Sequence, residues 1–95
     1  MKVKVHSILG IKKIIGQGDL EVAITQGSTL ESLLSEMVQT YGEVLSSYLY
    51  GPSGNDLLPH IRLMVNGRDI EFLDGLNTEL HNGDEILILP PVSGG

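Results

Sequence analysis

The chain has 95 residues, of which 41% are hydrophobic and 19% charged, and it contains no cysteine, so disulfides, zinc–cysteine sites and thiol catalysis are excluded. The net charge of −6 argues against binding to nucleic acid or to an anionic membrane, since both need a basic surface. Lysines stand near the start where a secretion signal needs apolar residues, so we expect one cytoplasmic domain.

The first 25 residues predict a β-hairpin. Apolar and polar residues alternate over 1–6 and again over 20–25, which indicates two strands with one buried face each. The glycine-containing segment 16–19 would turn the first strand onto the second. Residues 11–15 form either a short turn of helix or an irregular link, and the pattern alone leaves both open.

A helix follows the hairpin. Residues 28–31, Ser-Thr-Leu-Glu, match a capping box in which the Ser28 hydroxyl accepts a hydrogen bond from the backbone N–H of Glu31. An apolar stripe then predicts an amphipathic helix that ends at Gly42; its members are Leu30, Leu33, Leu34, Met37, Val38 and Tyr41. A second short helix is expected over 43–50, with an apolar side made of Val44, Leu45, Tyr48 and Leu49.

Three strands are predicted in the second half of the chain. Residues 61–65 alternate, and Asn66-Gly67 is typical of a type I′ hairpin turn into a brief strand over 68–71. The apolar run at 85–89 predicts a central strand buried on both faces.

The predicted order is therefore strand, strand, helix and then three strands. It indicates an α+β fold of the β-grasp, ubiquitin-like type, a mixed sheet with one main crossover helix. The last strand would lie beside the first and run parallel to it. We expect a β-grasp domain over 1–89, followed by an extended tail over 90–95 with a flexible Gly-Gly end.

No conventional active site is evident in the predicted domain. His6, His60 and His81 show no metal-ligand spacing, and Gly16-Gln17-Gly18 lacks the rest of a dinucleotide-binding motif. We therefore expect that the chain binds no metal and no cofactor. Asp69, Glu71 and Asp74 cluster in a turn region and have no partner base, so they are interpreted as solubilising residues.

The tail is the most informative segment. Pro90 and Pro91 cannot continue a strand, and no side chain after them is larger than that of Val92. Two terminal glycines make the tip thin enough to enter a narrow channel and present the Gly95 carboxylate inside another protein.

Residues 82–95 resemble the C-terminus of the MoaD family, the ubiquitin-like sulfur carriers of the MoaD/ThiS type that form the small subunit of molybdopterin synthase. Residues 28–34 and 65–67 are similar to the helix start and the central hairpin of that family, while Lys12-Lys13 depart from its usual Arg-Glu. The resemblance implies a β-grasp fold and a sulfur-carrying, non-catalytic subunit.

The resemblance also implies the chemistry and the partners. An adenylyltransferase of the MoeB or ThiF type, similar to ubiquitin-activating enzymes, would use ATP and Mg²⁺ to adenylate the carboxylate of Gly95. Sulfur from a persulfide would convert it to a thiocarboxylate, and a large subunit of the MoaE type would accept the tail for molybdopterin synthesis.

Each tail residue has an expected role. Gly95 carries the sulfur and Gly94 keeps the tip thin. Partner contacts are expected at Pro90, Pro91, Val92, Ser93, Leu89, Leu87 and Ile8, with Leu87, Leu89 and Ile8 as an apolar docking patch for which core burial is the competing interpretation.

Three alternatives remain open at this point. The sulfur acceptor could be thiazole, an amino acid or another cofactor precursor. The chain could instead be a protein modifier that joins Gly95 to lysines through isopeptide bonds, or a β-grasp interaction module without covalent chemistry. A carrier and a modifier share the adenylation step, so the tail does not separate them.

Overall fold

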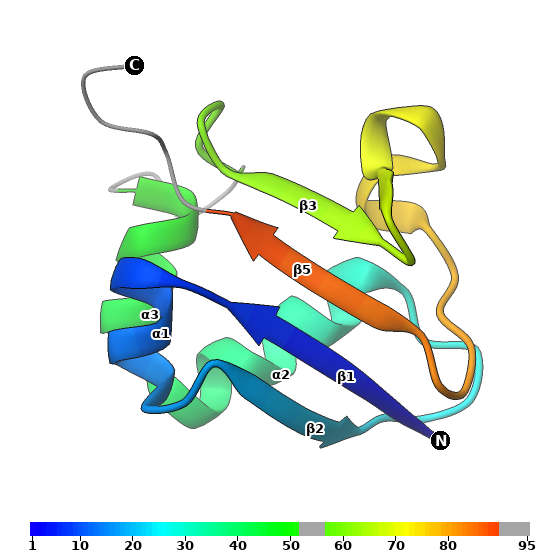
Figure 1. The fold of residues 1–95 in the computed structure, drawn as a ribbon, viewed down its shortest axis with the longest axis horizontal. Helices are drawn as coiled ribbons and strands as arrows, with labels where there is room; N and C mark the ends of the chain where they lie inside the picture. The colour runs from blue at the N-terminus through cyan, green and yellow to red at the C-terminus, as the bar shows by residue number, and fades with distance from the viewer. Residues whose placement is uncertain (52–56, 90–95) are drawn as a thin grey trace.

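The computed structural model describes residues 1–51 and 57–89. Its centre is a five-stranded sheet in the order β2-β1-β5-β3-β4 (Figure 1). β5 is central as predicted, parallel to β1 and antiparallel to β3. The mixed sheet confirms the predicted α+β, β-grasp architecture. The strands are β1 (Lys2–Ser7), β2 (Asp19–Ala23), β3 (Arg62–Val65), β4 (Arg68–Asp69) and β5 (Glu85–Leu89).

The helices lie against one face of this sheet and leave the other face open (Figure 1). They are α1 (Leu9–Ile15), α2 (Leu30–Tyr41) and α3 (Glu43–Tyr50), and two short 3-10 helices, η2 (Ile70–Phe72) and η3 (Gly75–Asn77), follow β4. Residues 11–15, which the sequence left open, thus belong to a helix. Its apolar residues Ile11 and Ile15 are buried.

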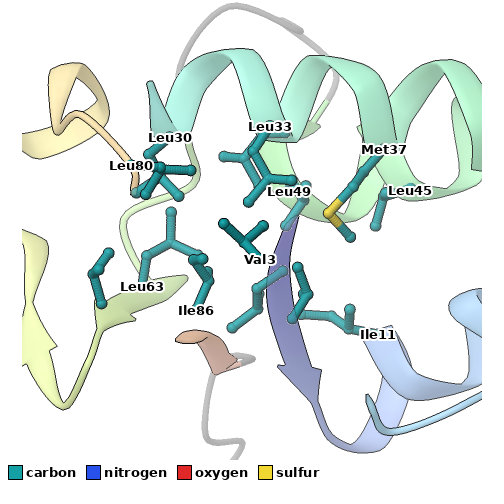
Figure 2. Close-up of a cluster of buried hydrophobic side chains, with 14 of the residues drawn as sticks. Val3, Ile11, Leu30, Leu33, Met37, Leu45, Leu49, Leu63, Leu80 and Ile86 are labelled. Atoms are coloured by element: carbon teal, nitrogen blue, oxygen red, sulfur yellow. The ribbon is translucent and has the colours of Figure 1, made fainter. Parts of the chain in front are cut away.

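The core fills the space between the sheet and α2 (Figure 2). The buried side chains of the strands come from alternate positions, namely Val3, Val5, Leu63, Val65, Ile86 and Ile88. The predicted burial of β5 on both faces is therefore wrong. Ile86 and Ile88 are fully buried, but Leu87 and Leu89 are only half-buried because none of the helices in the described part of the chain covers their side of the sheet.

The predicted apolar stripe of α2 is confirmed, but the capping box is wrong by one residue. Thr29, not Ser28, is the N-cap, and its Oγ1 accepts a hydrogen bond from the Ser32 N–H at 3.3 Å. Ser28 is held instead by its backbone, whose C=O accepts from the Leu80 N–H at 2.9 Å. That tertiary contact shifts the start of the helix, because it fixes Ser28 outside it.

α3 confirms the predicted second helix, with one exception on its apolar side. Leu45 and Leu49 are buried, whereas Val44 is 65% exposed. Gly42 joins the two helices at φ 77°, a conformation that glycine adopts most readily.

The hairpin between β3 and β4 is confirmed, with positive φ at both Asn66 (52°) and Gly67 (83°). β4 is shorter than the predicted strand, because the Asp69 carboxylate accepts a hydrogen bond from the backbone N–H of Glu71 at 2.9 Å. This bond caps η2 and ends the ladder.

Candidate functional site

The candidate site is the end of the sheet from which the chain continues into residues 90–95. At this end Ser7 of β1 pairs with Ile88, and Arg62 of β3 pairs with Leu89, so the last described residue of β5 lies at the middle of the sheet (Figure 1). The tail residues Pro90, Pro91, Val92, Ser93, Gly94 and Gly95 lie outside the described residues, and their roles stay predictions.

The predicted docking residues meet at this end, on the open face of the sheet. Leu87 is half-buried between His6 of β1 and Met64 of β3, and Leu89 is half-buried beside Arg62. Ile8, which is 44% exposed, follows Ser7 in extended conformation, so strand alternation turns it to the face of His6 and Leu87.

Two further apolar residues lie next to the predicted docking residues: Met64 is paired with Leu87 on the open face, and Leu9 follows Ile8 in the chain. Met64 is half-buried next to Leu87, and Leu9 is 67% exposed at the start of α1. The alternation of β3 predicts that Met64 points away from the core, and pairing β3 with β5 would then have placed Met64 beside Leu87. We define the tail-end patch as Ile8, Leu9, Met64, Leu87 and Leu89.

Leu9 is held in an unusual backbone conformation, with φ at 54°. A leucine in the left-handed region carries strain of roughly 1–2 kcal/mol, and an exposed leucine gains little from burial in return. Strained, exposed residues of this kind are concentrated at functional surfaces.

Replacing Leu9 with glycine tests whether this conformation is strained in the free protein. We expect Leu9→Gly to raise the free energy of unfolding by up to ~1 kcal/mol, because the relief of strain exceeds the added freedom of the unfolded chain. Urea unfolding gives the change in stability. A loss of stability would show that Leu9 packs productively in the free protein.

Charged groups frame the tail-end patch on both sides. On one side His6 bridges two carboxylates, with Nδ1 at 2.6 Å from Asp19 Oδ1 and Nε2 at 2.9 Å from Glu85 Oε1. On the other side Arg62 Nη2 lies 2.9 Å from Asp69 Oδ2. The hydrogen bond from the Glu71 N–H, and then the one from Arg62, lower the pKa of Asp69.

The bridge at His6 makes stability depend on pH. Hydrogen bonds to Asp19 and then to Glu85 raise the pKa of His6 above its ordinary value of 6.5, so folding favours the charged imidazolium. Its stabilising contribution is complete below pH 6.5 and is lost as the pH rises through the higher pKa of the folded state.

We therefore expect His6→Gln to destabilise the protein more at about pH 6 than at about pH 8.5. Urea unfolding of both proteins at the two pH values measures the difference. An equal loss at both values would contradict an imidazolium bridge, and an NMR titration of the His6 ring should show a midpoint above 6.5.

The described residues offer few other sites for chemistry. No group of three or more His, Asp or Glu residues among them could hold a metal ion. Within the same part of the chain, none of the helices has the length and apolar character needed to cross a membrane.

Comparison with known proteins agrees with this geometry. The sequence profile of the ThiS family matches residues 10–95. The chain belongs to the ThiS family. This ThiS-family chain is thus related to the ubiquitin-like sulfur carriers and small modifiers, a group that works with activating enzymes.

Three relatives of this ThiS-family chain differ in their named roles. A candidate sulfur carrier protein of Archaeoglobus fulgidus is 38% identical over 85% of this chain and 89% of its own length. Small archaeal modifier protein 3 of Haloferax volcanii is 24% identical over the whole of both chains. Sulfur carrier protein CysO of Mycobacterium tuberculosis is 32% identical over 73% of this chain and 74% of its own.

Solved structures extend the likeness to the fold. Small archaeal modifier protein 1 of Methanosarcina acetivorans superposes with a TM-score of 0.81 at 31% identity, over 99% of this chain and 96% of its own. CysO from the Amycolatopsis orientalis BexX/CysO complex has a TM-score of 0.72 at 28% identity, over 98% and 99%. Molybdopterin converting factor subunit 1 of Pyrococcus furiosus has a TM-score of 0.73 at 22% identity, over 97% and 99%, a likeness of fold alone.

Proposed function

We propose that this chain carries sulfur as a thiocarboxylate on Gly95 and that the tail-end patch docks the adenylyltransferase that activates it. The observation that carries the proposal is the position of β5: it is the central strand, and it leads from the tail-end patch on the open face of the sheet into the Pro-Pro-Val-Ser-Gly-Gly segment. Membership of the ThiS family supports the same chemistry.

The proposed reaction has three steps. The Gly95 carboxylate attacks ATP, in the presence of Mg²⁺, to give an acyl-adenylate and pyrophosphate, which replaces a poor leaving group with a good one. A persulfide sulfur of a donor protein then displaces AMP. A second thiol cleaves the resulting S–S bond, forming a disulfide and leaving the thiocarboxylate on Gly95.

Intact mass tests this proposal. After incubation with a ThiF-type adenylyltransferase, ATP, Mg²⁺ and a sulfide source, the chain should become about 16 Da heavier, the difference between sulfur and oxygen. The starting mass must also show that Gly95 is the last residue. A functional protein that extends beyond Gly95, or a mass that stays unchanged after activation, would refute the proposal.

The acceptor is a finer question. The tail motif favours donation to a pterin precursor in a complex with a MoaE-type large subunit, since residues 90–95 match that branch of the resemblance. A CysO-type role is the alternative, because sulfur carrier protein CysO is 32% identical over 73% of this chain. Incubating the thiocarboxylate form with a molybdopterin synthase large subunit and its precursor, and assaying sulfur loss from the carrier, distinguishes the two.

Protein modification is a second candidate function, favoured by the likeness to small archaeal modifier protein 3 over the full length of both chains. A modifier should appear in lysates as conjugates of higher mass, joined through an isopeptide bond from Gly95 to lysine. A carrier should appear only as the free thiocarboxylate.

A further inference from the structure

A second surface lies at the edge of the sheet formed by β2. A hollow of about 550 Å³ separates this strand from the second half of α2. Its most buried lining residues are apolar or aromatic, namely Leu20, Val22, Met37 and Tyr41. The more exposed lining residues are Glu21, Ala23, Glu36, Gln39 and Thr40.

The backbone of β2 is open along this hollow. Among the described strands, β2 pairs only with β1. Beyond the end of β2, the Ile24 N–H donates to the Met1 C=O at 2.8 Å and the Met1 amino group donates to the Ile24 C=O at 2.9 Å. Such exchanging pairs recur at every second residue of an antiparallel ladder, so Val22 also directs its N–H and C=O to β1. Glu21 and Ala23 therefore direct theirs outward, where no described residue accepts or donates a bond to them.

The rim of the hollow is acidic. Glu21 on the strand and Glu36 on the helix line it, and none of its lining residues is basic. Lys2 lies 3.5 Å from Glu21, but both side chains are exposed, and such a pair is weak and exchangeable. A second copy paired edge to edge would bring these carboxylates together, so charge disfavours self-association here.

We propose that the β2 edge and this hollow bind an extended segment of a partner protein that carries aliphatic residues flanked by lysine or arginine. The segment would add a strand beside β2 through the outward backbone groups of Glu21 and Ala23. Every second side chain would enter the hollow beside Val22 and Met37, and the basic residues would reach Glu21 and Glu36.

This surface is separate from the candidate site. β1 lies between β2 and β5, so a segment bound at the edge leaves the tail-end patch uncovered. A partner could thus hold this chain by β2 while residues 90–95 are engaged in another active site. The inference stands whether or not Gly95 carries sulfur.

Titration of the full-length, ¹⁵N-labelled chain tests the proposal. The probe is a blocked peptide that alternates valine and lysine; its controls are the same peptide with glutamate in place of lysine and the lysine peptide N-methylated at alternate positions. We expect the lysine peptide to shift the amide signals of Glu21, Ala23 and Thr40 and to slow hydrogen exchange at the Glu21 and Ala23 N–H groups.

Charge reversal on the rim supplies the matched variants. Glu36→Lys should weaken binding of the lysine peptide about tenfold, whereas Glu71→Lys, equally a reversal at an exposed site but on η2, should leave it unchanged. Circular dichroism should show both variants folded.

Several outcomes would overturn the proposal: equal binding of the glutamate peptide, undiminished binding of the N-methylated peptide, or shifts confined to other strands. If the amide signals of β2 shifted with protein concentration in the absence of peptide, the β2 edge would bind a second copy of this chain. That result would also overturn the proposal.

Discussion

Gly94→Ala should leave the fold intact and nearly abolish activation. A methyl group one residue from the reacting carboxylate thickens the tip of the tail, and displacing a reacting group by about 1 Å costs on the order of 10²-fold in rate. Because the sequence predicts that residues 90–95 form a tail beyond β5, the free energy of unfolding should change by less than ~0.5 kcal/mol. ATP–pyrophosphate exchange by the adenylyltransferase measures the loss, which should fall on kcat.

Gly18→Ala is the matched control for this result. Gly18 lies in the turn before β2 without a positive φ, and a Cβ there would meet its nearest atom, Lys12 Cε, at 3.4 Å. Both stability and activation should stay as in the parent protein. If Gly94→Ala were activated as fast as Gly18→Ala, the channel that the tail enters would not require a thin tip, and the proposed role of Gly94 would be wrong.

The sequence was most informative where a pattern is local. The stripe of α2 and the turn at Asn66-Gly67 follow from side-chain period and backbone preference, and both were predicted correctly. The capping residue of α2 was missed, since the choice between Ser28 and Thr29 depends on a hydrogen bond from Leu80, which lies far away in the chain. A hydrogen bond between residues so far apart in the chain leaves no pattern in the sequence around the helix start.

The same distinction applies to the candidate site. Leu87 and Leu89 could be named from the run that precedes the tail, but their exposure depends on which sheet face the helices cover. The apolar run of β5 alone suggested burial on both faces. Met64 joins the patch only through the register of β3 on β5, and the positive φ of Leu9 has no signature in its residue type. A site whose residues come from several strands can therefore be recognised only after the order and register of those strands are known.

Leu87→Glu is expected to separate docking from chemistry. Leu87 lies on the open face between His6 and Met64, at the centre of the tail-end patch. Both ring nitrogens of His6 are already bonded to carboxylates, so a new carboxylate there would be desolvated without a matching partner when the adenylyltransferase covers the patch. Such desolvation typically costs ~2–3 kcal/mol of binding, or about 10²-fold in kcat/KM. Since the tail itself is unchanged, the loss should appear in KM, while kcat at saturation is retained.

Val44→Glu provides the control for an added carboxylate at an exposed apolar position. Val44 is 65% exposed on α3 and does not belong to the tail-end patch, so its substitution should leave KM unchanged. Both variants should unfold at urea concentrations close to that of the parent, because neither side chain is part of the buried core. If Leu87→Glu and Val44→Glu were activated equally well, the adenylyltransferase would recognise the tail alone. The contrast between a kcat effect at Gly94 and a KM effect at Leu87 would instead assign delivery to the tail and recognition to the open face of the sheet.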